Sequence, residues 1–395
     1  MNRGGDGGDP RLAALRQWLQ QQPAHLALAV DSLRPASTDA SFRRYFRIDA
    51  AQRYGGALIV MDAPPAREDC RPYVRIAALL HDAGLHAPRI VADDLALGFL
   101  LLTDLGQTTY LAALRDTQGE TEPSLTPHPA PVAESIDSSL ASPIAASSVA
   151  HVTMPITAHN PAPAARPHRA HELMIAAIAA LVRWQGASRA GVLPAYERAL
   201  LQRELDLFPE WYVARHLGRP LSPTQLTILH DAFAQIIASA LAQPSVYVHR
   251  DFMPRNLMVC DPNPGILDFQ DAVSGPISYD IASLLRDAFI SWDEELELDW
   301  AIRYWDAARR AQLPVAADFG DFFRALEWMG LQRHLKVLGL FARINYRDGK
   351  PDYLADTPRF VRYVRRVTQR YSALAPLARL FDELDRSAGR LGATL

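Results

Sequence analysis

Short apolar runs and one amphipathic segment alternate in the first part of the chain. Apolar residues at helical spacing, led by a proline, predict a helix within residues 10–30 that breaks at Pro23. Runs rich in β-branched and aromatic residues predict strands at 41–49 and 56–63, and a second helix is predicted at 68–83. The sequences APRIVADD and GFLLLTDLG then flank a short turn, which predicts a hairpin. Together these elements predict a small α+β unit at residues 10–106.

The pattern becomes mainly helical after His171. Helical spacing of apolar residues continues to the C-terminus, interrupted by a short β-rich section at 246–270, and predicts a larger unit over residues 171–395. Residues 107–170 connect the two units, and their central part, about 117–167, is crowded with Pro, Ala, Ser and Thr. Such a composition buries too little apolar surface to offset chain entropy, so we expect a disordered insertion there, and a disordered Gly- and Asp-rich tail at 1–9.

Composition excludes several classes of protein. The 395 residues carry 41 basic and 44 acidic side chains, a net charge of −3, which gives no electrostatic reason to expect nucleic acid or a membrane surface as a partner. Two cysteines are too few for a disulfide framework or a Cys-based zinc site. The N-terminus has no signal-peptide pattern, and no apolar stretch approaches ~18 residues. We therefore expect a cytoplasmic monomer.

The candidate chemistry is concentrated in residues 248–285, VHRDFMPRNLMVCDPNPGILDFQDAVSGPISYDIASLL. Asp251 ends a His-Arg-Asp triplet, Asn256 follows five positions later, and Asp268 follows a hairpin turn in an apolar strand. Phosphoryl transfer from ATP requires a carboxylate that orients and deprotonates the attacking hydroxyl, and oxygen ligands that hold Mg²⁺ against the phosphates. The triplet alone is a weak signal, because a His-Arg-Asp sequence can occur by chance. The ordered series predicts Asp251 as the base and Asn256 and Asp268 as the metal ligands.

This segment resembles the Brenner motif region of the aminoglycoside phosphotransferase and choline kinase superfamily. The resemblance implies a two-lobed, protein-kinase-like α+β fold, with a small β-rich N-terminal lobe that binds nucleotide and a larger, mainly helical catalytic lobe. It also implies ATP and Mg²⁺ as cofactors, and matches Asp280 in GPISYDIASLL to a buried structural acid. By the same resemblance, the connector residues Asp104, Leu105 and Gly106 are candidates for contact with the adenine.

Further segments are similar to one bacterial subfamily. These are ASFRRYFRI, LIVMDAPPARED, TDLG, LDLFPEWYVARHLG and QRHLKVLGLFARINYRDGKPDYL. They resemble the anomeric kinases that phosphorylate N-acetylmuramate and N-acetylglucosamine to sugar 1-phosphates in peptidoglycan recycling. Two alternatives stay open: a kinase of another small polar alcohol, such as an aminoglycoside or choline, and a nucleotide-binding pseudokinase that acts as a regulator.

The pseudokinase alternative is motivated by two missing parts of the nucleotide site. The chain has no glycine-rich loop, and Met61 stands where a kinase carries its phosphate-binding strand lysine; no lysine precedes Lys336. Arginine can meet phosphate charge instead. The candidates are Arg43, Arg44 and Arg47, helped by the backbone at Ser41, although these arginines also fit surface charges on an edge strand. Alternation places Arg43 and Arg47 on one face of the strand and Arg44 on the other.

The substrate side is less well defined. Glu204, Trp211, Asp271 and Arg333 are candidate sugar contacts, since a sugar site needs polar groups, often an aromatic platform, and a cation for the carboxylate of N-acetylmuramate. Trp211 also fits a core position, and Asp271 also fits a strand-end cap. Arg255, inside the catalytic loop, is a candidate either for the substrate or for the phosphoryl group in transfer.

Overall fold

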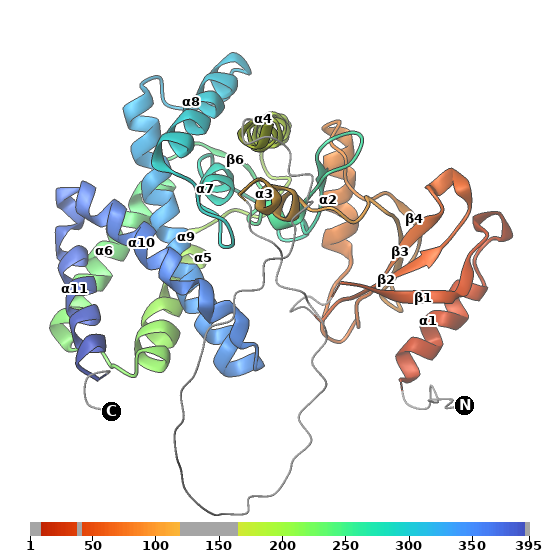
Figure 1. Cartoon of the computed structure of the whole chain (residues 1–395), viewed down its shortest axis with the longest axis horizontal. Helices are drawn as coiled ribbons and strands as arrows, with labels where there is room; N and C mark the ends of the chain where they lie inside the picture. Colours follow the sequence, from red (N-terminus) through yellow and green to blue (C-terminus); the bar gives the residue numbers. More distant parts are fainter. Residues whose placement is uncertain (1–8, 38–41, 119–164, 392–395) are drawn as a thin grey trace, which may run out of the picture.

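The computed structural model describes residues 9–37, 42–118 and 165–391 of the chain. Figure 1 shows two lobes side by side, with the red and orange N-terminal segments on one side and the green and blue C-terminal helices on the other. This arrangement matches the predicted division into a small β-rich lobe and a larger helical lobe. Most of the predicted tail and of the predicted insertion lies outside the described residues.

The N-terminal lobe is built on a five-stranded antiparallel sheet in the order β1-β2-β3-β5-β4. The predicted hairpin is confirmed as β4 and β5. The helix predicted within 10–30 is α1, which ends at Gln20, shortly before the predicted break at Pro23, and the chain enters a strand at Ala29. The elements are α1 (Pro10–Gln20), β1 (Ala29–Ser37), β2 (Arg44–Asp49), β3 (Ala57–Asp62), α2 (Arg71–Asp82), β4 (Ile90–Asp94) and β5 (Phe99–Thr103).

The two faces of this sheet bury different sets of side chains. On one face, Leu58 and Val60 of β3 pack with Leu15 and Trp18 of α1. On the other face, Met61 joins the large core that continues into the C-terminal lobe. Each strand therefore places alternate residues in two separate cores, as the two-residue period of a strand requires.

The C-terminal lobe surrounds one long helix, α9, which packs against many of the other helices of the lobe. The lobe is mainly helical, as predicted, and in one segment α5 is followed directly by a π-helix, η3. The elements are α3 (Tyr110–Gln118), α4 (Ala165–Gly186), α5 (Arg198–Leu207), η3 (Phe208–His216), α6 (Pro223–Leu241), β6 (Ser245–Val248), η4 (Pro254–Asn256), β7 (Leu257–Met258), β8 (Gly265–Ile266), β9 (Val273–Pro276), α7 (Tyr279–Leu285), α8 (Glu294–Arg310), α9 (Phe319–Asp348), α10 (Thr357–Arg370) and α11 (Ala375–Leu391).

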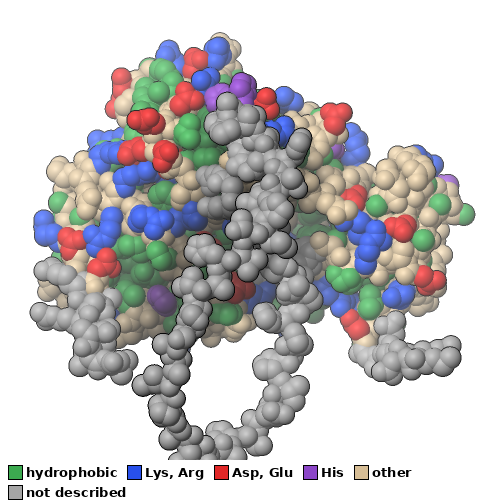
Figure 2. Space-filling model, viewed as in Figure 1, with side chains coloured by type: hydrophobic (Ala, Val, Ile, Leu, Met, Phe, Trp, Pro, Cys, Tyr) green, Lys and Arg blue, Asp and Glu red, His purple; other side chains and the backbone are tan. Residues whose placement is uncertain are grey.

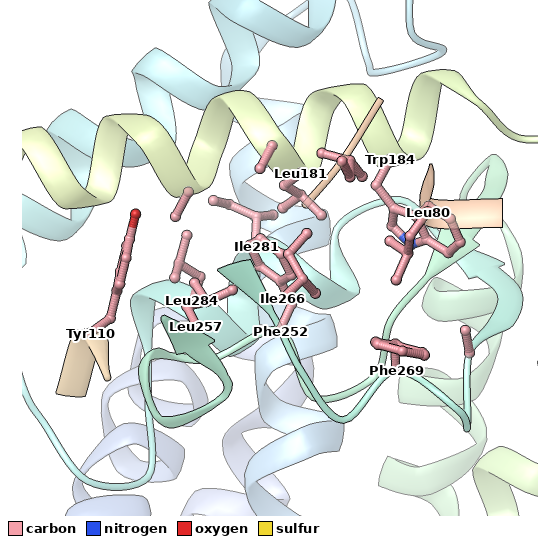
Figure 3. Close-up of a cluster of buried hydrophobic side chains, with 14 of the residues drawn as sticks. Leu80, Tyr110, Leu181, Trp184, Phe252, Leu257, Ile266, Phe269, Ile281 and Leu284 are labelled. Atoms are coloured by element: carbon pink, nitrogen blue, oxygen red, sulfur yellow. The ribbon is translucent and has the colours of Figure 1, made fainter. Parts of the chain in front are cut away.

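The small hairpin β7–β8 lies where the two lobes meet. Its side chains Leu257 and Ile266 pack against Ile281 of α7 and Leu181 of α4, as Figure 3 shows. The Ile266 amide also donates to the carbonyl of His86 in the N-terminal lobe, at 2.7 Å. The segment that carries the candidate chemistry is therefore fixed by buried apolar contacts below and by backbone hydrogen bonds at its sides.

The surface over the face shown in Figure 2 carries interspersed acidic and basic side chains. Among the described residues, no helix combines the length and the apolar character that a bilayer crossing requires.

Candidate active site

The catalytic loop begins where β6 ends, and its backbone is held by one buried carboxylate. Asp280 of α7 is fully buried and accepts the backbone N–H groups of His249 and Arg250, at 2.6 and 3.0 Å. Arg250 has a φ of 77°, a left-handed conformation that costs energy in a residue other than glycine. Burial raises the pKa of Asp280 to about 7 against the opposing effect of these two N–H groups. Asp280 therefore fixes the backbone that presents Asp251, in agreement with the structural role implied by the resemblance.

The candidate metal ligands lie next to one another and to Asp251. The amide nitrogen Nδ2 of Asn256 donates to the Asp251 carbonyl at 3.0 Å and lies 3.4 Å from Oδ2 of Asp268. Oδ1 of Asp268 accepts from the Gln270 side chain at 2.8 Å. Asp268 has a φ of 61°, so its backbone turns sharply just after β8. The structure thus brings together the three residues on which the predicted chemistry depends.

This donor set suits Mg²⁺. Both contacts described for Asn256 use its Nδ2, and its amide oxygen Oδ1 is a suitable metal ligand. Asp268 supplies a carboxylate, and the two contacts described for it come from the uncharged amides of Asn256 and Gln270. Mg²⁺ prefers such hard oxygen ligands and completes its shell with water and substrate phosphates rather than with a full protein cage. Asn256 and Asp268 therefore fit the ion that the sequence predicts.

An arginine–glutamate pair lies on the N-terminal side of this site. Arg43, just before β2, forms an ion pair with Glu68 at 2.8 Å, and both side chains are largely buried. The ring of Tyr73 on α2 lies 4.7 Å from that of Phe269, which follows the metal-ligand candidate Asp268. Tyr73 therefore joins α2 of the N-terminal lobe to the segment that carries Asp268.

The other two arginines of the cluster have different roles. Arg44 points to the α1 face, where its Nε donates to the fully buried Asp62 at 2.8 Å, and Arg11 of α1 binds the same carboxylate at 2.5 Å. This placement contradicts a nucleotide contact for Arg44, which instead holds α1 on the sheet. Arg47 lies on the same face as Arg43 but binds Asp104 through two hydrogen bonds, at 2.6 and 3.0 Å.

The connector between the lobes is organised by this Arg47–Asp104 pair. Asp104 also accepts the Gly106 amide at 2.9 Å, and Gly106 has a φ of 99°, a backbone conformation that favours glycine. Leu105 is buried against Gly265 of β8, where an added Cβ would lie 2.9 Å from its Cδ1. Arg47 also donates to the Gly106 carbonyl at 3.0 Å, so the side chains of Arg47 and Asp104 together fix the backbone of the connector. Ser41 lies outside the described residues.

Two of the four predicted sugar contacts are buried beneath the catalytic loop. Oε1 of Glu204 binds Arg250 at 2.6 Å and Lys336 at 2.9 Å, while Oε2 accepts from Gln332 at 3.0 Å and from Tyr196. These four donors occupy both oxygens of Glu204, so the prediction that it contacts the sugar is wrong.

Arg333, the second of these predicted sugar contacts, is also buried in the structure. Only 3% of it is exposed, and its Nη2 lies 3.7 Å from the Met253 sulfur in the catalytic loop. Its charge lowers the pKa of the carboxyls of Asp280 and Asp287 against the larger raising effect of burial. Arg333 therefore lies buried beneath the loop, a placement that does not favour the predicted contact with a sugar.

The remaining candidates are more accessible. Asp271 is exposed, three residues after the metal-ligand candidate Asp268. Trp211 is half-buried on η3, and the Arg215 guanidinium lies 5.4 Å from its ring centroid. The Arg255 guanidinium lies 4.9 Å from the ring centroid of Phe289. These placements leave Asp271, Trp211 and Arg255 as candidates for the substrate side.

Sequence reasoning missed one residue of the network beneath the catalytic loop. Lys336 of α9 forms an ion pair with Glu204 at 2.9 Å and donates to the Tyr279 hydroxyl at 3.2 Å. The scarcity of lysine was the signal that could have drawn attention to it, since the chain has only two lysines.

Comparison with known proteins agrees with this geometry. The chain matches the model of the phosphotransferase enzyme family (APH) over residues 32–125 and 121–319. An N-acetylmuramate/N-acetylglucosamine kinase from Pseudomonas aeruginosa is 45% identical over 379 residues, which cover 96% of this chain and 94% of the relative. A kinase of the same name from Neisseria meningitidis serogroup B is 45% identical over 349 residues, 88% of this chain and 89% of the relative.

Solved structures of lower sequence identity share the fold. The choline kinase LicA from Streptococcus pneumoniae aligns with a TM-score of 0.53 at 10% identity, over 89% of this chain and 99% of that one. The ADP-bound aminoglycoside phosphotransferase APH(2'')-Ib aligns with a TM-score of 0.50 at 12% identity, over 95% and 99%. These likenesses confirm the predicted kinase-like fold, and the family match confirms the predicted superfamily. The chain belongs to the phosphotransferase enzyme family, in the branch formed by these N-acetylmuramate/N-acetylglucosamine kinases.

Proposed function

We propose that this enzyme transfers the γ-phosphoryl group of ATP to the anomeric hydroxyl of N-acetylmuramate and of N-acetylglucosamine, giving the sugar 1-phosphates. The observation that carries the proposal is the convergence of Asp251, Asn256 and Asp268 at the hairpin between the lobes. The substrate class is taken from the two relatives at 45% identity, both named for these sugars. Because ATP is a cytoplasmic nucleotide, a cytoplasmic location belongs to the same proposal, as does a monomeric state.

The carboxylate of Asp251 is assigned as the general base. It would accept the proton of the anomeric hydroxyl as the bond from that oxygen to phosphorus forms and the bond to ADP breaks. Asp280 supports this role because it fixes the backbone on the N-terminal side of Asp251, and Asn256 supports it by binding the Asp251 carbonyl. We assign Arg255 of the same loop to negative charge on the acceptor or on the phosphoryl group in transfer.

Asn256 and Asp268 are assigned to Mg²⁺, which when bound neutralises charge on the phosphates and aligns them for transfer. On the other side of the nucleotide, we assign Arg43 to the phosphates. Its pairing with Glu68 reproduces the cation–carboxylate pair that kinases form with their strand lysine. The connector residues Asp104, Leu105 and Gly106 are assigned to the adenine edge, and Asp271 and Trp211 to the sugar.

The decisive experiment is a panel of acceptors incubated with Mg-ATP and followed by phosphorus NMR. The panel contains N-acetylmuramate, N-acetylglucosamine, choline and an aminoglycoside. We expect ADP formation with the two amino sugars and a product signal coupled to the anomeric proton. A phosphate ester at another hydroxyl would refute the anomeric assignment. Turnover of choline or the aminoglycoside alone would favour the other kinase classes, and nucleotide binding without turnover of any acceptor would favour a pseudokinase.

A further inference from the structure

Guanidinium groups from three separate elements gather around one residue, Phe289, in the segment between α7 and α8. Nη2 of Arg115 on α3 and Nη2 of Arg359 on α10 each donate to the Phe289 carbonyl at 3.4 Å. The guanidinium of Arg255 in the catalytic loop lies 4.9 Å from the centroid of the Phe289 ring. Because both Nη2 atoms approach the same oxygen, they can be separated by no more than twice their distance from it.

The backbone at Phe289 is fixed by a buried acid. Asp287 is fully buried, and its Oδ1 accepts the backbone N–H groups of Phe289 and Ile290, at 2.7 and 3.2 Å. Arg359 is held further by a hydrogen bond from its Nη1 to the Ser291 hydroxyl. The arginines therefore meet at a defined place in the fold and not on a freely solvated surface.

The contacts between these arginines and the protein leave positive charge in excess. Hydrogen bonds of 3.4 Å are longer than the usual 2.7–3.2 Å, and a neutral carbonyl balances no charge. Asp356 lies 3.9 Å from Nη2 of Arg359, and Arg115 forms no ion pair within the described parts of the chain. The Nε atoms of Arg115 and Arg359 are buried and have no hydrogen-bond partner among the described residues. One partly exposed carboxylate thus faces two guanidinium groups, an arrangement that suits an additional anion.

The position of this cluster relates it to the acceptor. Arg255 stands directly before Asn256 and four positions after Asp251, so its contact with Phe289 joins the cluster to the catalytic loop. The two proposed sugars share the reacting hydroxyl on C1 and differ at C3, where N-acetylmuramate alone carries a lactyl group with a carboxylate. Planar guanidinium groups bind carboxylates through paired hydrogen bonds, which are stronger than those to a neutral carbonyl.

We propose that Arg115 and Arg359 form a subsite for the lactyl carboxylate of N-acetylmuramate, with Arg255 between this subsite and the catalytic residues. The inference rests on the proposed function and deepens it, because it assigns the recognition of one sugar to residues that the other sugar does not need. It also replaces Arg333, the cation predicted from the sequence, with two arginines from α3 and α10.

Steady-state kinetics with the two sugars test the subsite. Arg115→Met and Arg359→Met remove the guanidinium and keep an apolar chain. A hydrogen bond to a charged group is strong enough that its loss should lower kcat/KM for N-acetylmuramate roughly 10- to 150-fold in each variant. The kcat/KM for N-acetylglucosamine should stay near the wild-type value, which also shows that the variants fold. Arg359→Lys should retain part of the preference, because it keeps the charge without the planar fork.

The matched control is Arg362→Met, which removes an exposed arginine from the same helix, α10. It should leave kcat/KM for both sugars near the wild-type values. A selective loss of N-acetylmuramate turnover in this control would show that the effect is one of general surface charge and would overturn the subsite.

A second measurement needs no turnover. Isothermal titration calorimetry, in the presence of Mg-ADP, compares N-acetylmuramate with its carboxamide, in which the lactyl carboxylate becomes a neutral amide. The wild-type enzyme should bind the carboxamide at least about tenfold more weakly, and this difference should largely disappear in Arg115→Met and Arg359→Met. If either variant fails to fold, the Arg→Lys variant at the same position and the carboxamide comparison in the wild type decide the question.

The inference is overturned if the wild-type enzyme binds the acid and the carboxamide equally, or if it does not bind N-acetylmuramate. It is also overturned if Arg115→Met and Arg359→Met lower kcat/KM for both sugars by the same factor, or for neither. Failure of the proposed function is a different result, the absence of sugar turnover in the wild-type enzyme, and the calorimetric difference between acid and carboxamide remains measurable in that case.

Discussion

Two adjacent arginines should give opposite phenotypes when each is replaced by alanine. Arg43 faces the side of the sheet that meets the catalytic lobe and pairs with Glu68, whereas Arg44 faces α1 and pairs with Asp62. We predict that Arg43→Ala impairs use of ATP with little effect on folding, and that Arg44→Ala lowers stability with little effect on ATP.

The magnitude for Arg44→Ala follows from what remains around Asp62. Breaking a buried ion pair costs about 3–5 kcal/mol when the remaining charge has no other partner. Here Arg11 stays at 2.5 Å from Asp62, and the Arg44 side chain is 38% exposed, so solvent screens the lost interaction. We therefore expect the free energy of unfolding to fall by about 1–2 kcal/mol.

The magnitude for Arg43→Ala follows from the contact it is proposed to make with phosphate. A hydrogen bond to a charged group contributes about 1.5–3 kcal/mol. At about 1.4 kcal/mol for each factor of ten, its loss lowers kcat/KM for ATP roughly 10- to 150-fold. Arg43→Lys should recover only part of this, because an ammonium group lacks the planar fork that can serve Glu68 and a phosphate together.

The assay measures kcat and KM for ATP at saturating sugar, with urea unfolding of the same preparations. Arg44→Ala serves as the matched control for Arg43→Ala, since both remove one guanidinium from neighbouring positions. Equal increases in the KM for ATP in the two variants would contradict the prediction that Arg43 contacts the nucleotide and Arg44 does not. Wild-type kinetics in Arg43→Ala would refute the role of Arg43.

Three further predictions concern the catalytic lobe. Asp251→Asn should lower kcat by ~10²–10⁴ while ADP still raises the melting temperature, and activity near wild type would exclude Asp251 as the base. Burial alone would raise the pKa of Glu204, but Lys336 and Arg250 outweigh burial and lower this pKa from 4.5 to about 2. The ionised carboxylate therefore stabilises the fold above pH 4.5, and this contribution is lost as the pH falls toward 2. In urea unfolding, the difference in stability between wild type and Glu204→Gln should shrink across that pH range. A Cβ at Gly339 would lie 2.2 Å from the Leu207 backbone carbon, whereas at Gly330 the nearest atom is 3.5 Å away, so Gly339→Ala should cost about 1–3 kcal/mol in urea unfolding and Gly330→Ala much less.

The core of the candidate site was predictable because it is local in sequence. Asp251, Asn256 and Asp268 belong to one loop and the hairpin that follows it. The order of these residue types along a strand–turn–strand pattern therefore fixes their proximity without knowledge of the rest of the fold. The contact of Asp280 with the loop spans about 30 residues and came only from the resemblance; it is present in the structure.

The network beneath the loop could not be predicted because its contacts span long sequence separations. Glu204 reaches Arg250 over 46 residues and Gln332 over 128. A polar side chain on an amphipathic helix gives the same local pattern whether it faces solvent or a buried partner from another helix. Glu204 and Arg333 were for this reason assigned to the substrate, although both belong to the support of the loop.

The N-terminal sheet illustrates a related limit and explains how the missing lysine is tolerated. Alternation separates Arg43 from Arg44, but both faces of the sheet are covered, by α1 on one side and by the catalytic lobe on the other, so the pattern alone does not identify the nucleotide face. Met61 is fully buried in the core shared by the lobes, where an ammonium group without a partner would be costly. Arg43 lies just before β2, at the sheet margin beside Glu68, and its guanidinium offers five N–H donors. Moving the cation from the strand interior to this margin keeps its pairing with an acid near α2, and this is the basis of our proposal that the absence of the strand lysine is a relocation of charge rather than a loss of function.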